Sequence, residues 1–336
     1  QTTSIHSIKD NRNMKIYSGE VIEFLPDHNA KTIEIKVTGE HLNLRNLVVK
    51  KGATLKDVFE KINPSELSNL NAFQLYRQSV AQQQKVLLEV PTQREECCHT
   101  GGGMVFDKSG NLFLTVGNNT SNSNSDGYAP IDERPGQAYW DDQRGASNTN
   151  DLRGKILRIH PEANGTYTIP KGNLFAPGTP KPKPEIYTMG HRNPWRPSID
   201  SKTGFLYWGE VGPDASVDSE KGPRGYDEFN QAKGPGYYGW PYFIGDNKAY
   251  ADVNFETMAI GPKFNPAAPV NESPNNTGLR ELPTATKAMI WYPYGTSEEF
   301  PLVGSSGRSA TGGPVFRKAD FAGAKRAFPS YYEGKW

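Results

Sequence analysis

The chain has 336 residues, 35% of them hydrophobic and 22% charged, and it contains 34 glycines, 26 prolines, 16 tyrosines and 15 phenylalanines. This composition predicts a turn-rich all-β protein rather than a helical one. A formal net charge of +1 gives no basic field for nucleic acid, no stretch reaches the roughly 18 to 20 apolar residues that span a membrane, and two cysteines exclude a disulfide scaffold.

Residues 1–84 combine strand-like runs with the most helix-like part of the chain. A helix is expected over 54–84, where Thr54 and Ser65 can act as N-caps and apolar residues recur at helical spacing. The strand-like runs are "KIYSGEVIEFL", "KTIEIKV" and "NLVV". We therefore expect a small N-terminal segment of mixed α/β structure over 1–84.

From residue 85 onward, short β-type runs alternate with turns rich in Gly, Asn and Pro. The first of these runs are "KVLLEV", "GGMVFD", "NLFLTVG", "GKILRIH", "GTYTI" and "EIYTMG". Residues 105–118 and 198–212 share one pattern, a strand, an Asp-to-Gly turn and an aromatic-containing strand, and 313–323 is a weaker copy. Their separation fits blades of a β-propeller. A β-sandwich is the rival architecture, and the repeat favours the propeller.

Cys97, Cys98 and His99 stand directly before the three glycines 101–103. A neutral histidine is suited to act as a general base, and glycines leave room for a flat cofactor or a sugar. The bland alternative is a loop histidine at the entry of a strand. Adjacent cysteines do not have the spacing of zinc ligands, so a zinc or thiol enzyme at this cluster is disfavoured. A vicinal disulfide and two free thiols both stay open.

A second candidate segment is "YTMGHRNPWRPSID". Gly190 ends a strand and Pro194 and Pro197 prevent its continuation, so 191–193 lie on a turn at a strand end. Ligand sites of propellers are built at such turns. Arg192 offers a rigid set of donors for carboxylates or for oxygens that develop negative charge. The alternative is a surface arginine with an ion-pair partner.

Residues 207–247 form the third candidate segment. This stretch combines many carboxylates with Gly-Pro turns and the aromatic run "GYYGWPYF". Calcium prefers carboxylate and carbonyl oxygens presented by loops, so a calcium site is one interpretation. A solvated acidic loop is the other interpretation, but the interleaved aromatic residues favour an ordered structure.

Taken in order, these segments resemble the glucose/sorbosone dehydrogenase family. The segments that carry the resemblance are "HTGGGMVFDKSGNLFLTVGNNT", "NTNDLRGKILRI", "YTMGHRNPWRPSID", "LYWGEVGPDA", "GYDEFNQA" and "YYGWPYF". Each one is weak alone, and their shared order is the strong signal. The resemblance implies a six-bladed β-propeller over 85–336 that uses pyrroloquinoline quinone. The longer stretch "VPTQREECCHTGG" is similar to sequences of the bacterial branch of this family, whose members are often joined to a cytochrome c module.

The resemblance also implies roles for individual residues. His99 matches the base that removes the proton of the sugar's anomeric hydroxyl. Arg192 is implied as catalytic, because it stabilises the reduced cofactor, and as cofactor-binding. The further implied cofactor contacts are Asn193, Gly212, Pro213 and Asp227. The implied calcium ligands are Gly212 and Pro213, through their carbonyls, and the acidic Glu228.

This sequence departs from the family's pattern in three places. Residues 1–84 do not show the usual opening blade, and Val211 stands where some members have a glutamine. The chain stops at Trp336, before the closing blade and the late basic residues of some relatives. We therefore expect a propeller that is truncated at the C-terminus of this chain.

The resulting hypothesis is a bacterial quinoprotein dehydrogenase that oxidises an aldose-type sugar to a lactone. Its implied cofactors are pyrroloquinoline quinone and Ca²⁺, and its implied electron acceptor is a cytochrome c or a quinone. The resemblance places it in the periplasm or outside the cell, without a membrane span. The alternative is a non-catalytic β-propeller that binds carbohydrate or protein.

Overall fold

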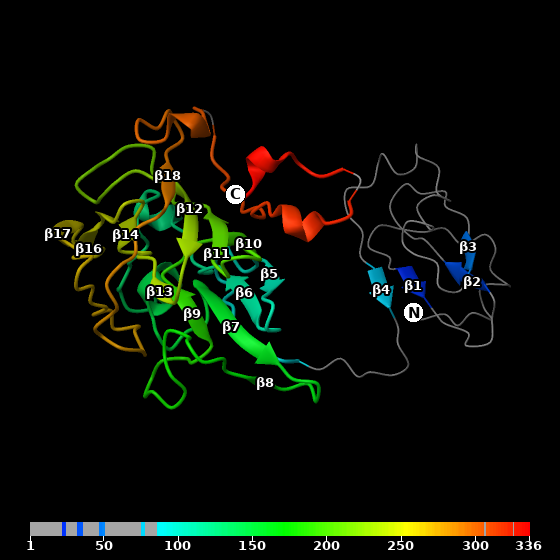
Figure 1. Cartoon of the computed structure of the whole chain (residues 1–336). Coiled ribbons are helices and arrows are strands. Elements are labelled where there is room, and N and C mark those ends of the chain that lie inside the picture. Colours follow the sequence, from blue (N-terminus) through cyan, green and yellow to red (C-terminus); the bar gives the residue numbers. More distant parts are fainter. Residues whose placement is uncertain are drawn as a thin grey trace, which may run out of the picture. The chain divides into compact units, whose positions relative to one another are not determined.

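The computed structural model describes residues 86–336 apart from Ser306 and Lys325, together with four short strands nearer the N-terminus (Figure 1). The chain divides into two compact units, Gln1–Lys85 and Val86–Trp336. In the described part of the chain, no helix is long and apolar enough to cross a membrane.

The described part of the first unit consists of two strand pairs. Strands β1 (Ile22–Phe24) and β4 (Leu75–Arg77) pair in parallel, and β2 (Thr32–Ile35) pairs antiparallel with β3 (Leu47–Lys50). The helix expected over 54–84 is therefore wrong at β4, and its other residues lie outside the described ones. Pairing with β1 overrides the helical periodicity there, since tertiary contacts outweigh weak local propensity.

The larger unit contains a six-stranded sheet in the order β13-β9-β7-β6-β5, with β8 paired to β7. Its members are β5 (Met104–Phe106), β6 (Leu112–Val116), β7 (Lys155–Pro161), β8 (Tyr167–Thr168), β9 (Ile186–Met189) and β13 (Gly236–Tyr237). Apart from the parallel β13–β9 pair, neighbouring strands run antiparallel. All four residues of β9 are buried, so this strand lies in the interior.

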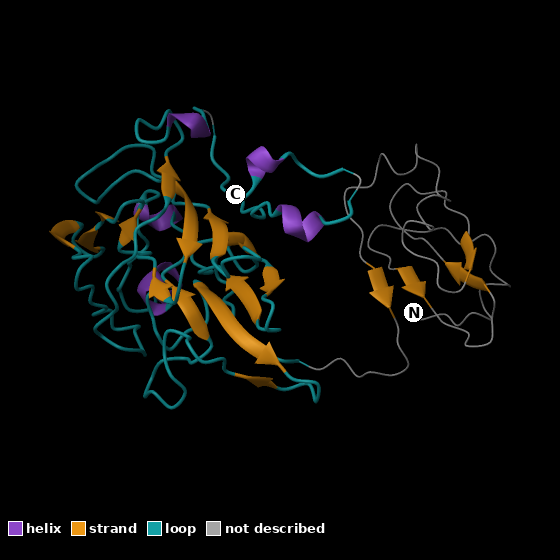
Figure 2. Cartoon of the chain, viewed as in Figure 1, coloured by secondary structure: helices purple, strands orange, loops and turns teal. Residues whose placement is uncertain are grey.

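A second sheet is four-stranded and fully antiparallel, in the order β10-β11-β12-β18. Its members are β10 (Pro194–Ile199), β11 (Leu206–Glu210), β12 (Asp227–Ala232) and β18 (Ile290–Tyr292). Two further hairpins are β14 (Phe243–Ile244) with β15 (Lys248–Ala249), and β16 (Ala251–Asn254) with β17 (Ala259–Lys263). Short 3-10 turns are the only helices among the described residues (Figure 2).

The two repeated segments are both antiparallel hairpins, as predicted. In the first, Asp107 accepts from the amides of Ser109 and Asn111, and Gly110 has a φ of +79°. In the second, Asp200 accepts from the amide of Lys202. The same Asp-to-Gly turn chemistry thus closes β5–β6 and β10–β11.

Two other strand predictions fail. Residues 86–90 form no strand, and the weaker copy over 313–323 contains a 3-10 turn, Lys318–Phe321, in place of a hairpin. This copy keeps the Asp-to-Gly spacing at Asp320 and Gly323, so the turn signal alone does not produce a hairpin. The fold is otherwise mostly strands in several sheets, in agreement with the all-β prediction.

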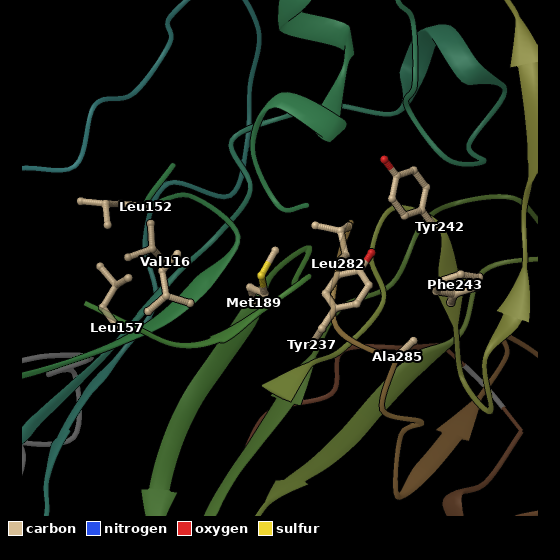
Figure 3. Packing of buried hydrophobic residues seen from close by; sticks show 10 residues of the cluster. Val116, Leu152, Leu157, Met189, Tyr237, Tyr242, Phe243, Leu282 and Ala285 are labelled. Carbon is tan, nitrogen blue, oxygen red and sulfur yellow. The ribbon is translucent and has the colours of Figure 1, made fainter. Parts of the chain in front are cut away.

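Buried side chains from the six-stranded sheet and from the loops beyond β13 form the main core (Figure 3). The cluster comprises Val116, Leu152, Leu157, Ile186, Met189, Tyr237, Tyr242, Phe243, Leu282 and Ala285. Burying each large apolar side chain contributes roughly 1.5–3 kcal/mol. Because β6 and β9 both belong to this cluster, the loops that follow them start from fixed points.

Gly190 ends β9 at the point where the chain turns toward the loop 191–193. It has a φ of +79°, and a Cβ there would lie 2.4 Å from the ring of Tyr237. Gly190→Ala should lower the free energy of unfolding by about 2–4 kcal/mol, from left-handed strain plus overpacking. Gly204→Ala is the matched control, because Gly204 has a φ of +73° and open space around it, and it should cost about 1–2 kcal/mol. Urea unfolding measures both, and equal losses would contradict the packing argument.

Candidate functional site

The loops that follow β6, β9 and β11 are joined to one another by backbone hydrogen bonds. The amide of Asn118 donates to the carbonyl of Arg192 at 2.9 Å, and the amide of Val211 donates to the carbonyl of Asn193 at 3.3 Å. The amide of Gly212 donates to Asp227, the first residue of β12, at 2.9 Å. The candidate residues of three loops and one strand are thereby brought to one place.

His99 reaches this place from the segment before β5. Its backbone has a φ of +57°, and its carbonyl accepts from the amide of Asn119 at 3.2 Å. A Cβ at Gly117 would lie 2.2 Å from the carbonyl oxygen of His99. Only a glycine at the end of β6 therefore allows the histidine segment to approach so closely.

The imidazole of His99 is oriented by a chain of two polar side chains. Nδ1–H of His99 donates to Oδ1 of Asn118 at 2.7 Å, and Nδ2 of Asn118 donates to Oδ2 of Asp142 at 2.5 Å. The indole of Trp240 donates to the same carboxyl oxygen of Asp142. An amide oxygen only accepts, so the proton lies on Nδ1 and the lone pair on Nε2 of His99.

The surroundings of His99 favour the neutral imidazole. Burial and, second to it, the nearby positive charge of Arg192 together lower its pKa to about 4, against the opposing bond to Asn118. Near pH 7 the ring is therefore uncharged, with Nε2 ready to accept a proton.

The two cysteines frame this histidine and do not share a ligand with it. Cys97 and Cys98 form a disulfide with each other, which decides between the two alternatives left open by the sequence. A disulfide has no thiolate to offer a metal, so a zinc site at Cys97, Cys98 and His99 is not supported. Among the described residues, no group of three or more His, Cys, Asp or Glu side chains could hold a metal ion.

The three glycines after His99 differ in what they face. A Cβ at Gly101 would meet nothing within 4 Å, whereas one at Gly102 would lie 2.1 Å from the carbonyl oxygen of Thr115. A Cβ at Gly103 would lie 2.6 Å from the ring of Pro197. Only Gly101 borders open space, so the expectation that all three clear room for a ligand is wrong for Gly102 and Gly103.

Arg192 lies on the turn between β9 and β10 and is almost fully buried, with 4% of its surface exposed. Its guanidinium donates from Nη1 to the carbonyl of Val211 at 2.9 Å and from Nη2 to Asp214 at 3.4 Å. Its Nε is buried without a partner, and burial lowers its pKa. Arg192 is therefore a buried cation, and the alternative of a surface arginine with an ion-pair partner is wrong.

The neighbouring His191 has a structural role. Its Nδ1–H donates to Glu210 at 3.0 Å, and its Nε2 lies 2.8 Å from the hydroxyl of Thr188, which donates to it. Both ring nitrogens are thus engaged inside the protein. Of the two histidines in the motif segments, only His99 keeps a nitrogen free for a substrate.

The turn at Gly212 and Pro213 follows β11 and packs against the start of β12. A Cβ at Gly212 would lie 1.7 Å from the carbonyl oxygen of Tyr226, so glycine is required there. The carboxylate of Asp227 accepts from the amides of Gly212 and Ala310. The carbonyl of Pro213 accepts a hydrogen bond at 2.7 Å from Nη2 of Arg308, a residue that the motif analysis did not include.

Glu228 is not brought to this turn. Its carboxyl accepts from the amide of Gly245 at 2.5 Å and from Asn230 at 2.9 Å, whereas Asp227 faces the turn. Successive strand residues point to opposite faces, which separates the two side chains. Burial, reinforced by the nearby Glu210, raises the pKa of Glu228 to about 8. Glu228 therefore faces away from the Gly212–Pro213 turn, where the resemblance implied that it binds calcium.

Sequence reasoning missed Asn118, Asp142 and Arg308, and also Tyr250, whose hydroxyl is buried without a hydrogen-bond partner. Asn118 belongs to the "GNNT" run, which reads as a turn signal, and Arg308 is far from the turn in sequence. A buried carboxyl whose pKa burial raises to about 7, as for Asp142, is invisible before the fold is known. The sequence signal that could have identified Asn118 was the run "GNNT". This run follows a predicted strand close to the histidine motif, where a side chain that orients His99 can lie.

The model of the family described as Glucose / Sorbosone dehydrogenase matches residues 60–275. A polysialic acid transport protein of Escherichia coli, KpsD, is 38% identical over 81 residues, which are 24% of this chain and 14% of that protein. Quinoprotein glucose dehydrogenase B of Acinetobacter calcoaceticus is 27% identical over 196 residues, which are 55% of this chain and 37% of that protein.

A crystal structure of a glucose dehydrogenase is similar over 59% of this chain and 41% of its own, with 25% identity and a TM-score of 0.33. The chain therefore spans less than half the length of each of these proteins.

The state of His99 can be measured directly. Its imidazole should titrate with a midpoint near pH 4 and carry the proton on Nδ1 at neutral pH. Because this pKa lies below the unfolded value of about 6.5, the unfolded chain takes up the proton first. The contribution of His99 to stability is then complete above about pH 6.5 and is lost as the pH falls toward 4. Nitrogen–proton NMR, assigned with His99→Gln, tests this, and a midpoint near 6.5 would contradict it.

The role of Asn118 can be tested with a single substitution. Asn118→Asp places a carboxylate beside Nδ1 of His99, which should raise the histidine pKa by about one unit or more. Asn111→Asp is the matched control, because Asn111 pairs in the same way with Nδ1 of His160, at 3.1 Å. The control should leave the His99 midpoint unchanged. An unchanged midpoint in Asn118→Asp would show that Asn118 does not set the protonation of the base.

Proposed function

The chain belongs to the glucose/sorbosone dehydrogenase family, and from that premise we propose that it oxidises an aldose-type sugar to its lactone with pyrroloquinoline quinone as the hydride acceptor. The observation that carries the proposal is the free Nε2 of His99, held neutral beside the buried guanidinium of Arg192. A base and a fixed cation at one place suit a reaction in which a hydroxyl loses its proton while the carbon that bears it loses a hydride.

His99 takes the proton in this reaction. Asn118 and Asp142 hold the imidazole so that Nε2 faces outward as acceptor, and the proton of the anomeric hydroxyl moves to that nitrogen. The positive charge of Arg192 opposes protonation of His99 in the free protein. An anionic ligand beside Arg192 offsets this charge, which raises the pKa of His99 and strengthens it as a base when the cofactor is bound.

The residues at the turn fit the quinone. When bound, pyrroloquinoline quinone supplies an electrophilic carbonyl that accepts the hydride and carboxylates that need donors. Around this turn, the buried donors without a hydrogen-bond partner are Nε of Arg192, Nε and Nη1 of Arg308 and the hydroxyl of Tyr250. Buried donors are almost always paired, so such a cluster indicates a ligand with several acceptor oxygens. Arg192, Asn193 and Asp227, with the Gly212–Pro213 turn, are the proposed cofactor contacts.

The residues at the same turn do not fit calcium. The carbonyl of Pro213 accepts from a guanidinium, and Glu228 is directed to the opposite face of β12. Two buried arginines already supply positive charge beside the proposed ligands, and a divalent cation there meets repulsion. No step of the proposed reaction is therefore assigned to calcium.

The finer architecture belongs to this proposal. We propose a six-bladed β-propeller over 85–336, with 1–84 as a separate N-terminal segment. The four-stranded antiparallel sheet β10-β11-β12-β18 has the strand number of one propeller blade, which supports the assignment.

We also propose a periplasmic or secreted bacterial location. The Cys97–Cys98 disulfide supports it, since disulfides persist in oxidising compartments. The electron acceptor of such an enzyme is a cytochrome c or another quinone.

A non-catalytic binding module is the second candidate, and one variant separates the two. His99→Ala should lower aldose-dependent dye reduction about 10²–10⁴-fold, the usual contribution of a general base, and leave quinone binding nearly unchanged. His160→Ala is the control, because His160 pairs with Asn111 and takes no part in the site. Unchanged turnover in His99→Ala removes the base assignment. Absence of both turnover and quinone binding in the unaltered protein favours the non-catalytic module.

A further inference from the structure

Arg308 places a buried guanidinium at the turn where the family resemblance implied calcium. The residue follows the 3-10 turn Pro301–Val303, and its side chain is 2% exposed. Nη2 donates to the carbonyl of Pro213 at 2.7 Å, and Nη1 lies 3.7 Å from Oδ1 of Asp227. The guanidinium carbon is 3.7 Å from the ring centre of Tyr294. These contacts fix the guanidinium from three sides.

The chain leaves space for this arginine. A Cβ at Gly225 would lie 1.7 Å from the carbonyl oxygen of Pro213 and 2.8 Å from Nη1 of Arg308. Only glycine at position 225 lets the carbonyl of Pro213 and the guanidinium of Arg308 lie so close to its backbone. The position of Arg308 is therefore matched by the backbone opposite it.

Arg308 and Arg192, which are far apart in sequence, both donate hydrogen bonds to the loop that follows β11. Arg192 donates to the carbonyl of Val211 and Arg308 to the carbonyl of Pro213, two residues further on. The charges of both arginines act on Asp227 and on Tyr250. Asp227 is buried, and its two oxygens accept from the amides of Gly212 and Ala310.

Arg308 also has donors to spare. Its Nε and Nη1 are buried without a hydrogen-bond partner, as are Nε of Arg192 and the hydroxyl of Tyr250. The two guanidinium groups face two carboxylates, Arg308 the buried Asp227 and Arg192 the more exposed Asp214, and these pairs leave several donor atoms unused. A buried cluster of guanidinium and hydroxyl donors without hydrogen-bond partners is completed by a ligand with negatively charged or carbonyl oxygens.

We propose that Arg308 takes over the position of the metal cation at the Gly212–Pro213 turn, and that with Arg192 and Tyr250 it binds the acidic quinone cofactor without calcium. This inference rests on the proposed function and goes beyond it, because it assigns a cofactor contact that the family's motifs do not include. The guanidinium supplies the positive charge that a metal ion would supply. It also brings hydrogen-bond donors, and it is a permanent part of the chain.

The experiment measures binding of pyrroloquinoline quinone by the unaltered protein in a metal chelator and in added calcium, with the metal content of the complex determined in parallel. The expected affinities agree within about threefold, and the complex contains no stoichiometric calcium. Arg308→Met should weaken binding about 10- to 100-fold in both conditions, as expected for the loss of charge-assisted hydrogen bonds. Arg308→Lys, which keeps the charge, should recover part of that loss.

The matched control is Arg224→Met, because Arg224 pairs with Asp218 at the surface, away from the turn, and should leave binding unchanged. Circular dichroism and urea unfolding show whether each variant is folded, and Arg308→Lys carries the test if Arg308→Met does not fold. Binding only in the presence of calcium, or equal binding by Arg308→Met, overturns the role of Arg308 and leaves the proposed function standing. Absence of binding in both conditions overturns the proposed function as well.

Discussion

The carboxyl group of Glu210 at the end of β11 fixes the geometry on which the site depends. It accepts from the amide of Arg192 at 2.5 Å, from Nδ1 of His191 at 3.0 Å and from the indole of Trp208 at 3.1 Å. Hydrogen bonds that involve charged groups contribute about 1.5–3 kcal/mol each, and leaving a buried partner unpaired costs as much again. This single side chain therefore ties the turn after β9 to the strand β11, and through Arg192 it sets the position of the guanidinium.

The same turn links the cation to the base. The carbonyl of Arg192 accepts from the amide of Asn118, whose side chain orients His99. The turn that carries the guanidinium is thus hydrogen-bonded to the residue that orients the imidazole. A proton acceptor and a positive charge that are held by one connected set of hydrogen bonds are suited to a reaction in which a proton and a hydride leave the same CH–OH group.

The sequence was informative where local chemistry decides the structure. The Asp-to-Gly turns predicted both hairpins, and Gly190 with Pro194 predicted the turn that presents Arg192. The predicted helix failed at β4, because pairing with a distant strand is not encoded locally. Arg308 could not be foreseen, since its partner Pro213 is 95 positions away. The opposite directions of Asp227 and Glu228 follow from strand alternation, and reading them as one pair overlooked that rule.

The central claim is that this site removes a hydride from the anomeric carbon of a sugar while His99 takes the hydroxyl proton. The most direct measurement is the anaerobic reduction of the bound quinone in a single turnover, with an aldose that carries hydrogen or deuterium at C1. The account predicts that the quinone spectrum changes on addition of the sugar and that deuterium at C1 slows this change. A spectrum that the sugar leaves unaltered, or a rate that is the same for both isotopes when chemistry limits the turnover, would contradict it.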